Sequence, residues 1–130
     1  MMTNMINSVS SFLPLPVETV EWNDPNLILA GMTWSFSSVS SWRIIKDNKL
    51  VSGCYDKDSA SISSILKNSE IILVEIQSSQ LYIDPVFTFS NGYKLEIFST
   101  TFLEPWIFDF SSGIVYVASP STANTLGPGL

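Results

Sequence analysis

The sequence predicts an α+β domain: an antiparallel β-meander of about six to eight strands with one α-helix packed on a face. Three observations predict it. Residues 81–98 alternate apolar and polar side chains around a Ser-Asn-Gly turn, residues 106–117 repeat that pattern around Ser-Ser-Gly, and residues 59–68 have helical spacing of apolar side chains. The chain has 130 residues, 45% of them hydrophobic, which suffices for a packed core, so we expect residues 1–130 to form a single domain.

The register of the central hairpin follows from its polarity. A two-residue Asn-Gly loop would mix apolar and polar residues on each face. A three-residue Ser-Asn-Gly loop pairs Phe89 with Tyr93 and Phe87 with Leu95, which gives one apolar face. That loop needs a residue at positive φ, and Gly92 adopts such a φ without a Cβ clash.

The N-terminal part gives weaker signals. Residues 1–16 show no clear period, and two prolines favour extended backbone, so we expect an extended N-terminal segment. Residues 17–22 alternate and predict a short strand, which ends at an Asn-Asp-Pro-Asn turn cluster. Residues 27–37 predict one further strand in their second half.

A second hairpin and the helix follow. Residues 42–46 and 49–52 flank an Asp-Asn turn, so a two-residue loop sets Ile45 opposite Leu50 and Ile44 opposite Val51. Residues 59–68 are expected to be helical, with Asp56 or Asp58 as the N-cap. The narrow apolar stripe of this helix consists of Ile62, Ile65 and Leu66.

The next strand is nearly continuous in apolar residues, as expected of a central strand covered on part of both faces. It spans residues 70–77. A turn at Ser78-Ser79 would set Val74 opposite Ile83. Pro85 has no N–H to donate, so its strand bulges there or lies at an edge. The core face of residues 70–77 is expected to contain Ile72, Val74 and Ile76.

The final hairpin reuses the glycine turn. Trp106, Phe108 and Phe110 share one face, and the three-residue loop pairs Phe110 with Ile114 and Phe108 with Tyr116. Residues 119–130 are rich in Ser, Thr, Pro and Gly and are expected to form a flexible tail.

Composition excludes several classes of chemistry. Histidine is absent and Cys54 is the sole cysteine, so there is no usual general base, no Ser/His or Cys/His pair, no ordinary zinc site and no internal disulfide. The remaining acid–base candidates are two carboxylate pairs, Asp56 with Asp58 and Glu104 with Asp109. Helix capping and solvation account for these residues more simply, so we expect a protein that is not an enzyme and that has no cofactor or metal.

Charge is distributed unevenly along the chain. The net charge is −6, and all six basic residues lie between Arg43 and Lys94. An acidic domain repels phosphate backbones, so direct nucleic-acid binding is not expected, whereas a basic protein partner would be attracted. Acidity that serves only solubility is the alternative. No apolar run is long enough for a membrane span and no secretory signal is evident, so we expect a cytoplasmic protein without membrane contact.

The acids outside the basic region are candidates for partner binding. Each of the four tryptophans is expected in the core, although one exposed near carboxylates would make an interface anchor. Trp106 lies between two acids in sequence, so it is retained beside them even though it shares a face with Phe108 and Phe110. The candidate partner-binding residues are Glu18, Glu21, Asp24, Glu104, Trp106 and Asp109.

Residues 81–110, with F-SNG-x-x-L-x-I-F followed by Glu104-Pro105-Trp106, resemble small bacterial immunity proteins of polymorphic and contact-dependent toxin systems. The resemblance covers about residues 42–119. It implies a cytoplasmic, non-enzymatic protein that neutralises a cognate toxin by binding it, the toxin being basic where it is a nuclease. A structural or small-ligand-binding domain of unrelated role is the alternative.

Overall fold

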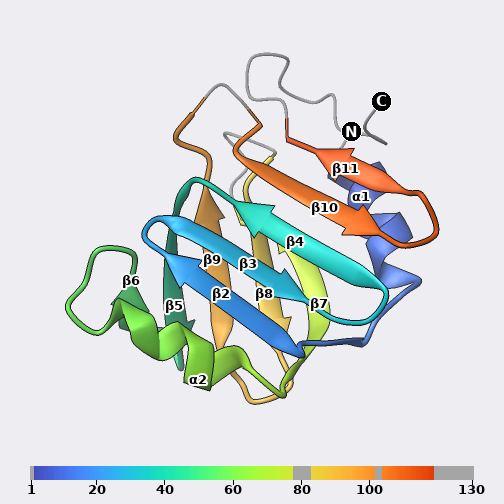
Figure 1. Cartoon of the computed structure of the whole chain (residues 1–130). Coiled ribbons are helices and arrows are strands. Elements are labelled where there is room, and N and C mark those ends of the chain that lie inside the picture. The colour runs from blue at the N-terminus through green and yellow to red at the C-terminus, as the bar shows by residue number, and fades with distance from the viewer. Residues whose placement is uncertain (1, 78–82, 102–103, 119–130) are drawn as a thin grey trace.

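Two antiparallel sheets pack face to face in the computed structural model, which describes residues 2–77, 83–101 and 104–118 (Figure 1). Sheet A has the strand order β1-β7-β8-β9-β5-β6, and sheet B has the order β11-β10-β4-β3-β2. Sheet A comprises β1 (Leu15–Pro16), β7 (Glu70–Ile76), β8 (Pro85–Phe89), β9 (Lys94–Phe98), β5 (Ser41–Lys46) and β6 (Lys49–Gly53). Sheet B comprises β11 (Val115–Val117), β10 (Trp106–Phe110), β4 (Trp34–Ser38), β3 (Asn26–Ala30) and β2 (Thr19–Asn23). The inner face of each sheet is the one turned towards the other sheet.

The α+β meander with one helix packed on a face is therefore wrong: the described fold is a β-sandwich of eleven strands. One physical reason lies at residues 27–37, which form two strands, β3 and β4, instead of one. Gly31 donates its N–H to the Trp34 carbonyl at 3.0 Å and turns the chain. A Cβ on Gly31 would lie 2.4 Å from Trp34 Nε1 and 2.5 Å from the Pro16 carbonyl oxygen, so the turn requires glycine.

Aromatic side chains from both sheets form the centre of the core. Phe36 on β4 lies edge-on to Phe87 on β8, with ring centroids 4.8 Å apart, and Phe108 on β10 lies 5.9 Å from Phe87. All three are fully buried. Contacts of this kind between two inner faces hold a sandwich together. Trp34, Trp42 and Trp106 are also buried, as expected for core residues.

Helix α1 (Met2–Ser10) closes one side of the sandwich, beside β7 (Figure 1). Met5 and Val9, four residues apart, are fully buried in the core cluster. The expected extended conformation of residues 1–16 is thus replaced by a helix over its first part, because this spacing places two apolar side chains on one helical face. Only Leu15–Pro16 joins a sheet, as β1 beside β7.

The opposite side is closed by the 3-10 turn η1 (Ser59–Ser61) and helix α2 (Ile62–Leu66), which contact β6 and β2. Ile62 and Leu66 are fully buried, so the predicted apolar stripe packs inward. The helix is shorter than predicted, and Asp58 precedes η1 without a side-chain capping hydrogen bond. None of the described helices is long and apolar enough to cross a membrane.

The glycine-ended hairpins have the predicted register. Phe87 pairs with Leu95 across β8 and β9, and Gly92 has φ of +89°. Phe108 pairs with Tyr116 across β10 and β11. In the β5–β6 hairpin Ile45 pairs with Leu50 as predicted.

Four expectations fail in detail. Pro85 begins β8, which lies between β7 and β9, and it pairs in register with Ile76, so its strand neither lies at an edge nor bulges there. Ile44 pairs with Ser52 instead of Val51, because the register shifts between Ile44 and Ile45. A second shift in β7 turns Ile71 inward and leaves Ile72 exposed, so the predicted core face of that strand is wrong at this position. Val74 is buried as predicted but pairs with Phe87 and not with Ile83. The expected Ser78-Ser79 turn and the tail at 119–130 lie outside the described residues.

Replacing Gly92 with valine is expected to lower the free energy of unfolding by more than about 1 kcal/mol, because a β-branched residue is strained at positive φ. The nearest atom to an added Cβ is Lys46 Cε at 3.5 Å, so space is not the cause of the cost. Thermal melts of Gly92→Val and of Ser112→Val, at an exposed position of the equivalent turn whose φ is not positive, provide the comparison. Equal melting of Gly92→Val and the parent would refute the strained-turn account.

Candidate partner-binding surface

Glu21 and Asp109 lie on the outer face of sheet B. Along β2 and β10, side chains alternate between the two faces. Glu21 pairs with the exposed Ile28, and Asp109 pairs with Ser35, whereas the neighbours Phe108 and Phe110 point inward. Both carboxylates are exposed. The fold thus places acids from distant parts of the sequence on one surface.

Strand pairing defines a row of side chains across this outer face. The row consists of Glu21 on β2, Ile28 on β3, Ser37 on β4, Ile107 on β10 and Val117 on β11. Asp109 lies two residues further along β10. At the usual strand spacing, β2 and β10 are about 14 Å apart, since two strands lie between them. The two carboxylates therefore flank a centre of serine and isoleucine side chains.

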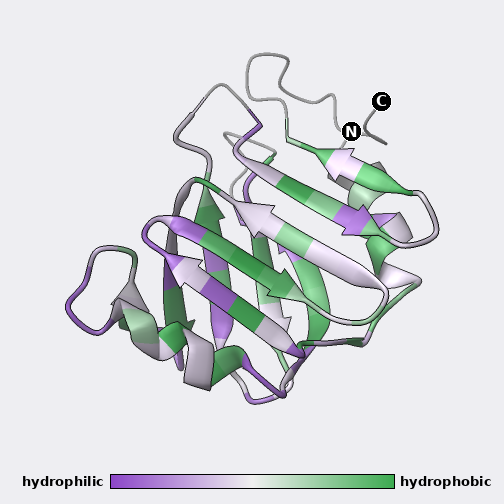
Figure 2. Ribbon diagram, viewed as in Figure 1, coloured by the Kyte–Doolittle hydropathy of each residue, from purple (hydrophilic) through white to green (hydrophobic). Residues whose placement is uncertain are grey.

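Positive charge is absent from the strands of sheet B. None of the five strands of sheet B contains lysine or arginine (Figure 2, where β2 and β10 each carry a purple segment). The six basic residues lie on β5, β6 and β9, in the loop before η1, and just after α2; they are Arg43, Lys46, Lys49, Lys94, Lys57 and Lys67. Within the described residues, the recorded ion pair is that of Arg43 with Glu96, on sheet A. The acids of sheet B therefore have no cation on their own sheet.

Asp24 occupies the β2–β3 turn and is already engaged. Its Oδ1 accepts a hydrogen bond from Trp22 Nε1 at 2.8 Å, and its Oδ2 accepts one from Ser59 Oγ at 2.7 Å. These bonds tie the turn to η1. Trp22 is 39% exposed beside this carboxylate, so the expected core position is wrong for this tryptophan. It pairs with the buried Leu27, so its indole belongs to the inner side of an edge strand and not to the outer face.

The three remaining candidate partner-binding residues differ in exposure. Glu18, just before β2, and Glu104, just before β10, are exposed. Trp106 is 1% exposed and donates a hydrogen bond from Nε1 to the Ile83 carbonyl at 2.9 Å. It is a core residue, the role that its shared face with Phe108 and Phe110 favoured.

The acids of the β6–η1 loop have structural partners. Asp56 Oδ2 accepts the Gly53 N–H at 3.0 Å, and Asp58 Oδ1 accepts a hydrogen bond from Ser52 Oγ at 2.9 Å. Over residues 2–77, 83–101 and 104–118, no group of three or more His, Cys, Asp or Glu side chains is placed to hold a metal ion. These two hydrogen bonds hold the loop against β6.

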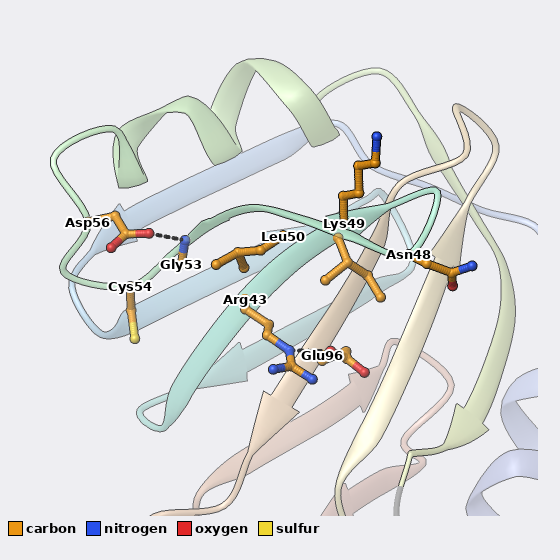
Figure 3. A pocket seen from close by; sticks show the side chains of 9 residues that line it. Arg43, Asn48, Lys49, Leu50, Gly53, Cys54, Asp56 and Glu96 are labelled. Atoms are coloured by element: carbon orange, nitrogen blue, oxygen red, sulfur yellow. Dashed lines mark hydrogen bonds and ion pairs between the residues drawn. The ribbon is translucent and has the colours of Figure 1, made fainter.

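A hollow of about 470 Å³ lies on the sheet A side, over β5, β6 and β9 (Figure 3). Its lining includes Ile45, Leu50 and Cys54 together with polar groups. Arg43 donates from Nε to Glu96 Oε1, and its guanidinium lies 4.9 Å from the centre of the Phe98 ring. Opposite charges therefore compensate each other in this hollow. Sequence reasoning missed it because the register shift in the β5–β6 hairpin has no sequence signal.

Searches against protein-family models, curated proteins and solved structures gave no match to this chain.

Proposed function

We propose that the protein is a cytoplasmic immunity protein that neutralises a cognate bacterial toxin domain by binding it, with the acidic side of sheet B covering the toxin's active site. The supporting observation is the segregation of charge: sheet B presents Glu21 and Asp109 on its outer face, and its strands contain no basic residue. Glu18 and Glu104 are further exposed acids, just before β2 and just before β10.

The physical argument is electrostatic complementarity. A toxin that cleaves nucleic acid binds phosphates in a basic cleft, and exposed carboxylates repeat the charge of that substrate. Such charges accelerate encounter and select the partner. The proposed role involves no catalytic step, no cofactor and no direct contact with nucleic acid.

A small-ligand-binding domain is the second candidate, and the hollow beside Arg43 and Leu50 is the observation that favours it. Its charges are internally compensated, whereas those of sheet B are not. The acidic surface therefore supports a protein partner better than the hollow supports a ligand.

The test is the association rate with a toxin domain identified in a gene that neighbours this one, used as a catalytically inactive variant. Reversing both Glu104 and Asp109 to lysine is expected to lower the association rate constant at least about tenfold at low salt, since steering by exposed charge acts mainly on that constant. Raising ionic strength is expected to slow the parent protein as well, because 0.1 M salt screens charges beyond about 10 Å.

Glu75→Lys, compared with the single reversal Asp109→Lys, is the matched control, since Glu75 is exposed on β7 of sheet A and the charge change is the same. It is expected to leave the association rate within about threefold of the parent, because it lies outside the proposed surface. An association rate constant that changes neither with salt nor with the double reversal would contradict the electrostatic mechanism.

A further inference from the structure

We infer that the apolar centre of the outer face of sheet B, formed by Ile28, Ser37, Ile107 and Val117, is the contact that holds the toxin in place. It fits a protein surface with an apolar centre and basic side chains around it. This inference rests on the proposed function and assigns the affinity of that contact to residues that carry no charge.

The first observation is that no element among the described residues covers this face. The helices close the two sides of the sandwich, and no described helix or strand lies over the outer face of sheet B (Figure 1). Ile28 is 37% exposed, and Ile107 and Val117 are half-buried. Branched side chains in one cross-strand row thus remain accessible without a covering element.

The second observation concerns the middle strand. On β4 the outward positions are Ser35 and Ser37, and both side chains are short. Ile28 on β3 and Ile107 on β10 stand on either side of Ser37, about 10 Å apart at two strand spacings. Short side chains between branched ones allow a partner's side chains to approach the sheet closely and exclude water there.

Charge identifies the kind of partner. Glu21 lies next to Ile28 in the row, and Asp109 lies two residues from Ile107 on the same strand face. An apolar centre bordered by charges of one sign is the usual arrangement of an interface in which the centre carries affinity and the rim carries selectivity. Because both border charges are negative, the complementary surface has basic side chains about the same distance apart.

The outer face of sheet A does not offer this arrangement. Its corresponding row consists of Leu73, Thr88, Lys94, Ile45 and Leu50. Lys94 is exposed in the middle of that row, and Arg43, Glu75 and Glu96 add charges of both signs around it. A cation at the centre opposes apolar contact with a basic partner.

The decisive experiment introduces one long cation into each face. Ser37→Lys places it at the centre of sheet B, and Ser41→Lys places it on β5 of sheet A, where Ser41 is equally half-buried and also faces outward. Binding of the same inactive toxin domain is measured by surface plasmon resonance, after thermal melts have shown that both variants fold. We expect Ser37→Lys to weaken binding at least 100-fold and Ser41→Lys to change it less than threefold.

A second pair of variants keeps the inference testable if Ser37→Lys does not fold. Ile28→Ser is expected to raise the dissociation rate constant about tenfold and to change the association rate constant little. Glu21→Gln is expected to lower the association rate constant and to change the dissociation rate constant little. The two differ because apolar contacts and steering charges act on different rate constants. Toxin binding that survives both Ser37→Lys and Ile28→Ser would overturn the inference and leave the proposed function standing. A parent protein that does not bind the toxin at all would overturn both.

Discussion

Replacing Phe108 with alanine is expected to lower the free energy of unfolding by about 3–5 kcal/mol, the usual cost of truncating a fully buried phenylalanine. Phe108 is fully buried on β10. Its ring centroid lies 5.0 Å from that of Phe110, 5.5 Å from Phe36 and 5.9 Å from Phe87, so it contacts rings of both sheets. Truncation opens a cavity at the place where the two sheets meet. A domain of this size has only about 5–15 kcal/mol of stability to lose.

Chemical denaturation with Ile107→Ala as the control measures this effect. Ile107 adjoins Phe108 on the same strand but is half-buried on the outer face. Its truncation is expected to cost only about 1 kcal/mol, because less apolar surface returns to water. Equal losses for the two variants would mean that β10 does not have one face in a shared core, and would contradict the sandwich.

Replacing Val9 with aspartate is expected to lower the free energy of unfolding by about 3 kcal/mol or more, because it buries a charge that has no partner. Val9 is fully buried where α1 closes the side of the sandwich next to β7. Asn7→Asp is the control, since Asn7 is exposed on the same helix and the product residue is the same. Urea unfolding midpoints separate the two variants.

The contrary result would be a Val9→Asp protein as stable as Asn7→Asp. That outcome would show that α1 does not pack on the sheets, in agreement with the extended N-terminal segment expected from the sequence.

Local structure was predictable where turn chemistry and alternation agree. Gly92 and Gly113 each end a three-residue loop with φ of +89° and +95°, and the alternation on either side fixes the register. The division into two sheets was not predictable from these signals. Alternation shows which residues share a face, but it does not show that β5 leaves the sheet of β4 and that β10 returns to it.

The missed elements have identifiable causes. The turn at Gly31 depends on the close approach of Trp34 and the Pro16 carbonyl, which only the folded chain brings together. Helix α1 did have a sequence signal that was missed: Met2, Met5, Ile6 and Val9 have the spacing of an amphipathic helix, and Met5 and Val9 are buried in the core.

The candidate surface was predictable in part. The run of acids without bases at both ends of the chain indicated the residues that sheet B collects, including Glu21 and Asp109. The engagement of Asp24 with Trp22 and Ser59 was not predictable, because Ser59 is distant in sequence. The apolar centre between the acids emerges only from the pairing of β3, β4 and β10.

The most direct measurement is methyl-labelled NMR of the protein titrated with the inactive toxin domain used in the binding tests. The two outer faces carry separate sets of methyl groups, with Ile28, Ile107 and Val117 on sheet B and Ile45, Leu50 and Leu73 on sheet A. The account predicts that the methyl signals of Ile28, Ile107 and Val117 shift or broaden on binding, while those of Ile45, Leu50 and Leu73 stay unchanged. Perturbation confined to the methyl groups of sheet A would contradict it.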